Sequence, residues 1–244
     1  MLAGAVFSSA AIAACATAGG FPRFGAGCTR ADFPSQGHTV RAELCRPHRG
    51  TGAAVIVLHG CGGFSTFDHR IVTRLPAYGI ATFDVDYFAL TPPTGTKGFC
   101  NGGGRAFDAF GIWTQTVLDA ADALRRVAGV KRVGIVGWSL GGGVAVQAAV
   151  AARAERHPFA ALVGFSTGAF GAESIASELP PTMLLSGGST DAIPLSETLP
   201  LYDALKAAHV PTSLFVYPHG SHEWPGRQGS EGLAHAAAFL RRHL

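Results

Sequence analysis

The stretch VGIVGWSLGGGVA, residues 133–145, decides the fold. Its first half is apolar and suits a buried strand, its centre reads Gly-x-Ser-x-Gly, and its second half consists of small residues that suit a closely packed helix. This pattern predicts a sharp strand-to-helix turn with Ser139 at its apex, where the flanking glycines avoid steric clash. The backbone N–H of Leu140 would then lie at a helix N-terminus, free to stabilise an oxyanion.

The same five-residue pattern occurs a second time as GFSTG, residues 164–168. An apolar run precedes it, but scattered glycine and serine and the pair Pro180-Pro181 come after it, so a long packed helix is not expected there. Ser139 has the strand, the turn and the helix, whereas Ser166 has only the strand. We therefore favour Ser139 as the nucleophile and interpret Ser166 as part of a loop at a strand end.

The composition fits one large globular domain. Among 244 residues, 48% are hydrophobic and 14% are charged, which indicates a substantial buried core, and 33 glycines indicate many tight turns. The net charge of +3 is mild, and no run of lysine and arginine of the kind that binds nucleic acid occurs. We expect a single domain over residues 21–244 with no cofactor, no metal and no nucleic-acid partner.

The first twenty residues carry no charge and end in small residues, as a signal peptide does, although a basic stretch at their start is missing. Cleavage motifs of the Ala-x-Ala type end at Ala16 and Ala18. Residues 12–15 also resemble a lipoprotein box, in which Cys15 would carry a lipid anchor. The alternative is an N-terminal helix lying on the domain. Because alanine and serine dominate, we expect no permanent membrane span and a secreted or periplasmic location.

Cysteine usage supports export. Without Cys15, four cysteines remain, an even number that suits two disulfides in an oxidising compartment. Three pairings are possible. We favour Cys28 with Cys45, which flank a short hairpin, and Cys61 with Cys100, which join two loops expected near the active site.

After this leader, strand patterns alternate with helix patterns, which predicts an α/β fold with a mostly parallel sheet covered by helices on both faces. Residues 39–45 alternate apolar and polar as an edge strand does, whereas residues 53–58 are apolar throughout, as in a strand buried on both faces. Further strands are expected at 80–84, 131–137, 159–165, 182–186 and 212–217, and helices at 67–78, 105–128, 140–153, 195–208 and 230–243.

Two residues placed after later strands complete a catalytic set with Ser139, because functional residues in such sheets gather at the carboxyl ends of the strands. Asp191 follows one strand, and the loop after the last strand holds His219 and His222. A serine hydroxyl needs an imidazole to accept its proton, and the imidazole needs a carboxylate to fix its tautomer. The order Ser, Asp, His is that of α/β-hydrolases. We favour His222 over His219 because it lies deeper in the loop.

The glycine-rich turn HGCGG, residues 59–63, leaves the first buried strand. Its backbone N–H groups, above all that of Cys61, would supply a second oxyanion donor. His59 also permits a metal or base interpretation, but no partner at metal-ligand spacing accompanies it, and loop shaping fits better. Asp84 and Asp86 are alternative acids that we interpret as loop-organising residues.

These motifs resemble the dienelactone hydrolase family of the α/β-hydrolase superfamily. The resemblance covers roughly residues 38–244 and implies a hydrolase, and no large helical cap is evident in the sequence. The family has three residues between a Tyr-Pro pair and its catalytic histidine, which is the position of His222, and the resemblance likewise implies Asp191 as the acid. The stretches that carry it are VLHGCGG at 57–63, TFDVDYF at 82–88, GWSLGG at 137–142 and YPHGSH at 217–222.

This chain departs from the pattern that dienelactone hydrolases resemble at two positions. Those enzymes have a cysteine where Ser139 stands and a glutamate where Gly60 stands. The chain is therefore more similar to a serine-bearing, exported branch of the family, for which an ester or lactone hydrolase is implied and no particular substrate. Candidates for lining a shallow acyl pocket are the aromatic residues Trp113, Phe170 and Trp224, with Phe88 and Phe99.

We thus expect a serine hydrolase that cleaves a small carboxylic ester through an acyl-enzyme. In this hypothesis Ser139 attacks, His222 transfers the proton and Asp191 orients His222, while the N–H groups of Cys61 and Leu140 hold the oxyanion. A peptidase or thioesterase with the same triad is an alternative that a substrate panel would distinguish. A non-catalytic binding protein of the same fold is a third, disfavoured because such a protein needs no complete triad.

Overall fold

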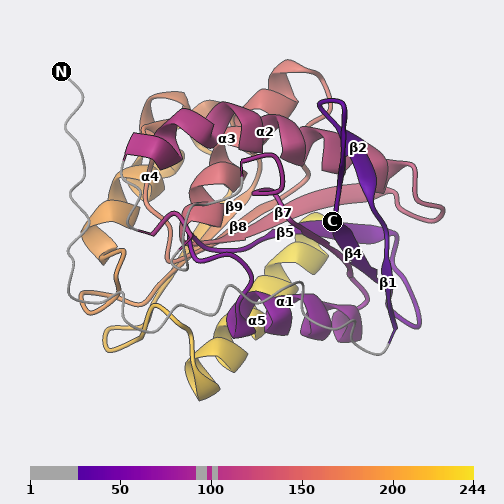
Figure 1. Cartoon of the computed structure of the whole chain (residues 1–244). Helices are drawn as coiled ribbons and strands as arrows, with labels where there is room; N and C mark the ends of the chain where they lie inside the picture. The colour runs from indigo at the N-terminus through magenta and orange to yellow at the C-terminus, as the bar shows by residue number, and fades with distance from the viewer. Residues whose placement is uncertain (1–26, 92–97, 101–103) are drawn as a thin grey trace.

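The structure, a computed structural model, describes residues 27–91, 98–100 and 104–244, and its centre is an eight-stranded sheet (Figure 1). Across the sheet the order is β1-β4-β6-β5-β7-β8-β9-β10. From β6 to β10 the neighbours pair in parallel, and β4 is antiparallel to both β1 and β6. The strands are β1 (Cys28–Arg30), β4 (Ala42–Cys45), β5 (Ala53–Leu58), β6 (Ala81–Val85), β7 (Arg132–Trp138), β8 (Leu162–Phe165), β9 (Thr182–Ser186) and β10 (Thr212–Val216).

Helices cover both faces of this sheet, which confirms the expected fold class. One face carries α2 (Gly104–Arg125), α3 (Leu140–Ala154) and α4 (Leu195–Ala207), and the other carries α1 (Thr66–Arg74) and α5 (Gly226–His243) (Figure 1). Between β8 and β9 the chain adds the 3-10 helix η2 (Ala172–Glu178). Within the described ranges, no large helical cap is inserted at that point.

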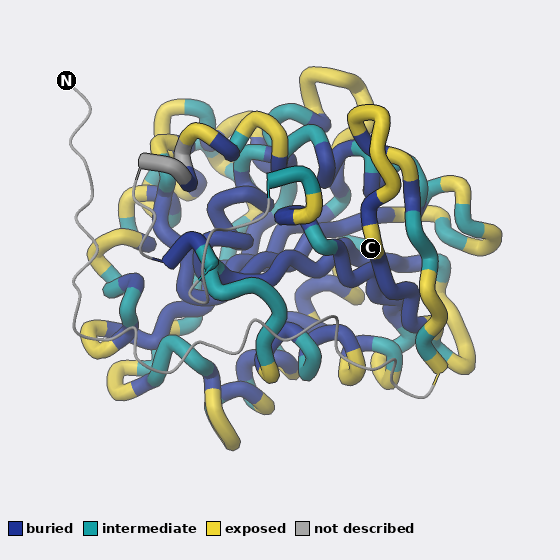
Figure 2. Tube along the Cα trace, viewed as in Figure 1, coloured by how far each residue is buried: buried dark blue, intermediate teal, exposed yellow. Residues whose placement is uncertain are grey.

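Strand β5 shows why the central strands are apolar throughout. Ala54, Ile56 and Leu58 pack in the hydrophobic cluster beneath α2 and α3. Val55 and Val57, which point the other way, pack in the cluster beneath α1 and α5. Because both faces are covered, these side chains are all removed from water, and the strands form the buried centre of the molecule (Figure 2).

The N-terminal part differs from the expected single edge strand at 39–45. The structure divides that segment between β3 (His38–Val40), which forms a separate hairpin with β2 (Phe33–Ser35), and β4, which joins the main sheet. Strand β4 is not an edge, because β1 pairs with its other side and all four of its residues are buried.

Two helix boundaries also shift for local reasons. The helix expected at 67–78 ends at Arg74 and continues as the 3-10 helix η1 (Leu75–Tyr78), because Pro76 lacks the N–H that a further α-helical turn requires. Helix α5 begins at Gly226, four residues before its expected start, directly after Pro225, an extended residue at the N-cap position.

Both favoured disulfides are present in the structure. Cys28–Cys45 links a directly paired position of β1 and β4, and Cys61–Cys100 links the turn after β5 to the segment that precedes α2. No helix in the described ranges combines the length and hydrophobicity that crossing a bilayer requires. The expected leader, with its cleavage motifs and Cys15, lies outside the described residues.

Candidate active site

Ser139 lies between β7 and α3 in a strained backbone conformation. Its φ of 56° and ψ of −121° fall in a region that residues other than glycine rarely adopt. Close packing enforces this turn, because a Cβ on Gly137 would overlap the carbonyl group of Gly141, and a Cβ on Gly141 would overlap the carbonyl oxygen of His59. The pattern's two glycines are therefore required by backbone contacts, and they hold the serine at the apex.

His222 bridges Ser139 and Asp191. Its Nε2 lies 3.0 Å from Oγ of Ser139, and its Nδ1 lies 2.5 Å from Oδ1 of Asp191. A carboxylate can only accept, so Nδ1 carries the proton and Nε2 is left to accept the hydroxyl proton of Ser139. The structure thus brings together the three residues that the sequence placed after β7, β9 and β10. His219 is exposed, and its backbone pairs with Gly188.

The carboxylate of Asp191 is buried and accepts several hydrogen bonds. The backbone N–H groups of Gly187 and Ile193 donate to it at 2.9 and 3.0 Å, and the hydroxyl of Ser166 donates to Oδ2. Burial alone raises the pKa of Asp191, but the hydrogen bond and charge of His222, then the bonds from Ser166 and Ile193, hold it below its ordinary value. The carboxylate is ionised at neutral pH.

The loop that carries His222 is anchored by residues that the sequence did not single out. The indole N–H of Trp138 donates to the carbonyl oxygen of His222 at 2.9 Å, and the side-chain amide of Gln228 bonds both backbone groups of Ser221 at 2.9 and 3.0 Å. Trp138 occupies the unspecified second position of Gly-x-Ser-x-Gly, so the pattern gives no signal for it. These bonds fix the backbone of residues 221 and 222, and thereby the position of the His222 imidazole.

The expected oxyanion donors lie on two segments that pack together. Leu140 opens α3, and Cys61 lies in the turn after β5, which contacts α3 through Gly141 and the His59 carbonyl. Among the described residues, no acceptor is bonded to the backbone N–H of Leu140 or of Cys61. The N–H of Phe99 donates to the carbonyl oxygen of Cys61 at 2.7 Å, and this bond stabilises the turn.

His59 is a buried residue that shapes this turn. Its ring stacks on Tyr87 with 4.3 Å between centroids, and its Nδ1 lies 2.9 Å from the carbonyl oxygen of Gly60. Burial lowers the pKa of His59 to about 4, so the ring is neutral at pH 7. The hydroxyl of Tyr87 donates to the His59 carbonyl oxygen at 2.8 Å and fixes the start of the turn.

The alternative acids lie elsewhere. Asp84 is in β6, directly opposite Glu43 of β4, and Asp86 follows the same strand. Burial, followed by the nearby carboxyl groups of Asp68 and Glu43, raises the pKa of Asp84 well above its ordinary value. The acid that contacts the imidazole of the site is Asp191 instead.

Metal-ligating side chains come close together at one place among the described residues. Sulfur and carboxylate atoms of Cys28, Glu43 and Cys45 lie within 4.8 Å of one another. The two cysteines are joined in a disulfide, so neither offers a thiolate to an ion.

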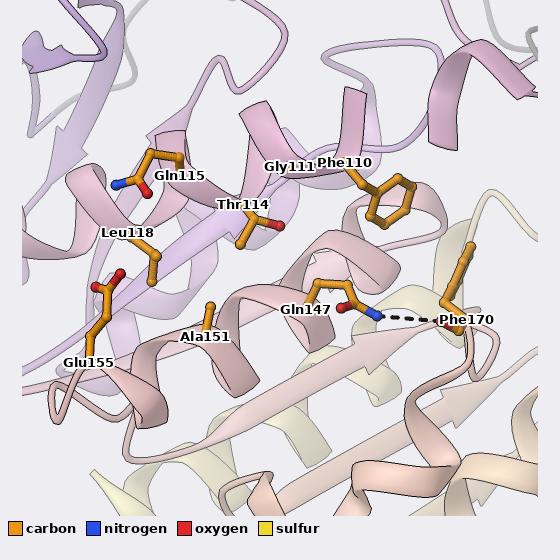
Figure 3. Close-up of a pocket in the computed structure, with 9 residues that line it drawn as sticks. All are labelled: Phe110, Gly111, Thr114, Gln115, Leu118, Gln147, Ala151, Glu155 and Phe170. Carbon is orange, nitrogen blue, oxygen red and sulfur yellow. Dashed lines mark hydrogen bonds between the residues drawn. The ribbon is translucent and has the colours of Figure 1, made fainter. Parts of the chain in front are cut away.

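The aromatic residues named for an acyl pocket occupy different places. Trp113 and Trp224 have no exposed surface and belong to the clusters on opposite faces of the sheet. Phe170 lines a groove of about 410 Å³ between α2 and α3, together with Phe110, Leu118 and Gln147 among others (Figure 3). The groove lies beside the middle and last turns of α3, and the three residues of the site are not among those that line it.

The sheet order, the helices on both faces and the Ser, Asp and His after β7, β9 and β10 define the α/β-hydrolase class. Within that class the chain belongs to the dienelactone hydrolase family, whose sequence profile matches residues 40–241. This match confirms the resemblance carried by the four motifs. No curated protein matches the sequence.

Several solved structures share the fold. The dienelactone hydrolase of Anabaena variabilis has a TM-score of 0.68 and 19% identity over 89% of this chain and 99% of that one. A cold-adapted esterase from an Arctic intertidal metagenomic library has a TM-score of 0.70 and 16% identity over 89% and 94%. The acylaminoacyl peptidase of Pyrococcus horikoshii has a TM-score of 0.67 and 14% identity over 89% and 42%. At such identities the likeness is one of fold alone.

Proposed function

We propose that this chain is a serine hydrolase that cleaves small carboxylic esters or lactones through an acyl-enzyme, with Ser139, His222 and Asp191 as its catalytic triad. The observation that carries the proposal is the position of His222, whose two ring nitrogens contact the serine hydroxyl and the carboxylate. Membership of a hydrolase family agrees with it. The serine in place of the cysteine of dienelactone hydrolases favours a general ester substrate.

In the first half-reaction, Oγ of Ser139 attacks the carbonyl carbon of the ester while Nε2 of His222 takes the hydroxyl proton. The carbonyl electron pair moves to the oxygen, and the N–H groups of Leu140 and Cys61 stabilise the resulting oxyanion. The intermediate then collapses, His222 gives its proton to the leaving alcohol oxygen, and the acyl group stays on Ser139.

In the second half-reaction, water takes the place of the alcohol. His222 removes a proton from the water as it attacks the acyl-enzyme, and then returns that proton to Oγ of Ser139 as the carboxylic acid leaves. Asp191 stays ionised throughout, because its donors hold its pKa low, and it stabilises the imidazolium that forms in each half.

The substitution Ser139→Ala tests this proposal. We expect it to lower kcat for p-nitrophenyl acetate by roughly 10³-fold or more, because the acyl-enzyme can no longer form. A fluorophosphonate probe should label the wild-type protein and leave the variant unlabelled. Unchanged turnover in the purified variant would exclude Ser139 as the nucleophile, and a wild-type protein that neither turns over nor labels would indicate a binding protein instead.

A matched panel of an oxyester, a thioester and an amide with the same acyl group tests which substrate class the enzyme prefers. This test is independent of whether Ser139 is the nucleophile. We expect the oxyester to have the highest kcat/KM. A thioester or a peptide amide that exceeds it would replace the esterase assignment with a thioesterase or a peptidase, and the triad assignment would stand.

We also propose that residues 1–20 direct export and that residues 21–244 form one domain. The two disulfides support an oxidising compartment. Mass spectrometry of the mature N-terminus tests the proposal, with cleavage near Ala16 or Ala18, or a lipid on Cys15, as the expected results. Recovery of an intact leader on the exported protein would contradict it.

A further inference from the structure

Ser166, the serine of the second Gly-x-Ser-x-Gly match, lies behind the acid of the site. It comes directly after β8, has no exposed surface, and adopts a φ of 46°, which is uncommon for a residue other than glycine. Its hydroxyl donates to Oδ2 of Asp191 and accepts the indole N–H of Trp224 at 2.8 Å. The sequence predicts its place in a loop at a strand end, but not this contact.

We propose that Ser166 is a positioning residue for the reaction. Held by Trp224, its hydroxyl fixes Oδ2 of Asp191 so that Oδ1 stays aimed at His222. This inference rests on the proposed function, because it needs Asp191 to act as the acid of the triad.

The distribution of donors around the carboxylate supports this role. Oδ1 of Asp191 accepts from His222 and from the N–H of Ile193, and Oδ2 accepts from the N–H of Gly187 and from Ser166. Each oxygen therefore has two partners, and the carboxylate cannot rotate without breaking bonds on both. Among the described residues, Ser166 is the one side-chain donor on the oxygen that faces away from the imidazole.

Trp224 determines which way the Ser166 hydroxyl points. A serine hydroxyl rotates freely and can donate or accept, so its direction depends on its neighbours. The indole N–H can only donate and thus occupies a lone pair of Oγ, which leaves the hydroxyl hydrogen for Asp191. The indole itself is fixed, because it packs edge-on against Phe165 and stacks with Phe67, at centroid distances of 5.2 and 6.0 Å.

The same contacts exclude Ser166 as a second nucleophile. Its hydroxyl hydrogen is committed to a carboxylate, and the oxygen accepts from an indole. The bond that it makes is also one of those that keep the pKa of Asp191 low in spite of burial. Without it, the buried carboxylate has one donor fewer in a place that water does not reach.

The substitution Ser166→Gly removes the hydroxyl without adding backbone strain, because glycine adopts a positive φ at no steric cost. We expect kcat for p-nitrophenyl acetate to fall about tenfold, with KM changed by less than about twofold, since the hydroxyl acts on the triad and not on the substrate. The acid limb of the kcat profile should move to higher pH, because a carboxylate with fewer donors interacts more strongly with the imidazolium. Trp224→Phe, which removes the indole N–H together with part of the ring but keeps an aromatic side chain in the cluster, should give a smaller loss in the same direction.

Thr198→Val is the matched control. It removes another fully buried hydroxyl of the same region, which donates to the Thr167 carbonyl oxygen at 2.9 Å and does not contact Asp191. We expect its kcat and its pH profile to match those of the wild type. Active sites are counted by the burst of p-nitrophenol in wild type and in the Ser166, Trp224 and Thr198 variants, so that kcat refers to folded enzyme.

Two results for Ser166→Gly would overturn the inference. The first is a kcat per active site equal to that of the wild type, with an acid limb that does not move. The second is a lower count of active sites with unchanged kcat, which would be a structural effect alone. Wild type and Ser139→Ala are measured in the same assay. If wild type is inactive, or if Ser139→Ala keeps its activity, the proposed function fails. If those two behave as expected and Ser166→Gly equals wild type, only the role of Ser166 fails.

Discussion

The two Gly-x-Ser-x-Gly turns of this chain lie side by side and have opposite surroundings. Strands β7 and β8 pair in parallel, and the N–H of Ser139 donates to the carbonyl oxygen of Phe165, the residue before Ser166, at 2.9 Å. Both serines have a positive φ, of 56° and 46°. Yet Ser139 contacts the imidazole of His222, whereas Ser166 contacts the carboxylate of Asp191. The pattern thus predicts a strained turn, and the tertiary neighbours decide its chemistry.

The segment after each turn accounts for the difference. The chain after Ser139 enters α3 at once, so its turn is closed by helix packing against the end of β5, and the hydroxyl faces the imidazole. The chain after Ser166 forms no helix until Ala172, and the indole of Trp224 covers its hydroxyl. Ser139 thus keeps 6% of its surface exposed beside a partly exposed His222, whereas Ser166 is closed off completely.

The largest expected difference between the turns lies in their last glycines. A Cβ on Gly141 would overlap the carbonyl oxygens of His59 and Leu58, which are backbone atoms at the end of a central strand and cannot move aside. A Cβ on Gly168 would meet its nearest atoms, of Glu197, at 3.6 Å, an ordinary contact. We expect Gly141→Ala to lower the free energy of unfolding by about 3 kcal/mol or more, and Gly168→Ala by less than about 1 kcal/mol.

Chemical denaturation followed by circular dichroism measures both changes, and the soluble yield gives a first indication. Because the Gly141 overlap also displaces Leu140, Gly141→Ala should lose activity in any protein that folds. Equal stability of the two variants would contradict the comparison, since it would mean that the turn at Ser139 relaxes as easily as the turn at Ser166.

The sequence predicts the parts of the fold whose signals are local. The apolar run of β5 and the glycine-rich start of α3 identify elements within a few residues, because burial on both faces and close helix contact leave a pattern in the chain itself. Strands β1 and β2, of three residues each, have no such pattern. The sequence predicts the bond between Cys28 and Cys45, but not that Cys28 stands in a strand that pairs with β4.

The same division holds for the site. The positions of Ser139, Asp191 and His222 can be derived from motif, chain order and strand ends, and the structure brings the three side chains into contact. The contacts of Ser166 with Asp191 and Trp224 join segments far apart in the sequence, and a buried serine leaves no local mark of what it bonds. The strand ends that carry the three site residues are therefore predictable from the sequence. The residues that contact Asp191 on the side away from His222 are not.

The two disulfides are expected to differ less in effect than the two glycines do. One disulfide lies beside the Ser139 turn, and the other is remote from it. Cys61–Cys100 closes a sequence separation of 39 residues and holds the turn that presents the Cys61 N–H. Cys28–Cys45 closes a separation of 17 residues at the β1 edge. Through the entropy of the unfolded chain, the first should contribute about 4 kcal/mol to stability and the second about 3 kcal/mol. Only the first should affect the oxyanion.

We expect the double variant Cys61→Ser with Cys100→Ser to lower kcat about tenfold, less than the complete loss of an oxyanion donor, because the backbone N–H remains but its position is less fixed. The double variant Cys28→Ser with Cys45→Ser is the control of similar stability, and its kcat should equal that of the wild type. Steady-state kinetics well below the unfolding transition of each variant separate the two effects. Equal kcat in both variants would show that the Cys61 turn holds its position without the disulfide, and that packing on Gly141 alone is sufficient.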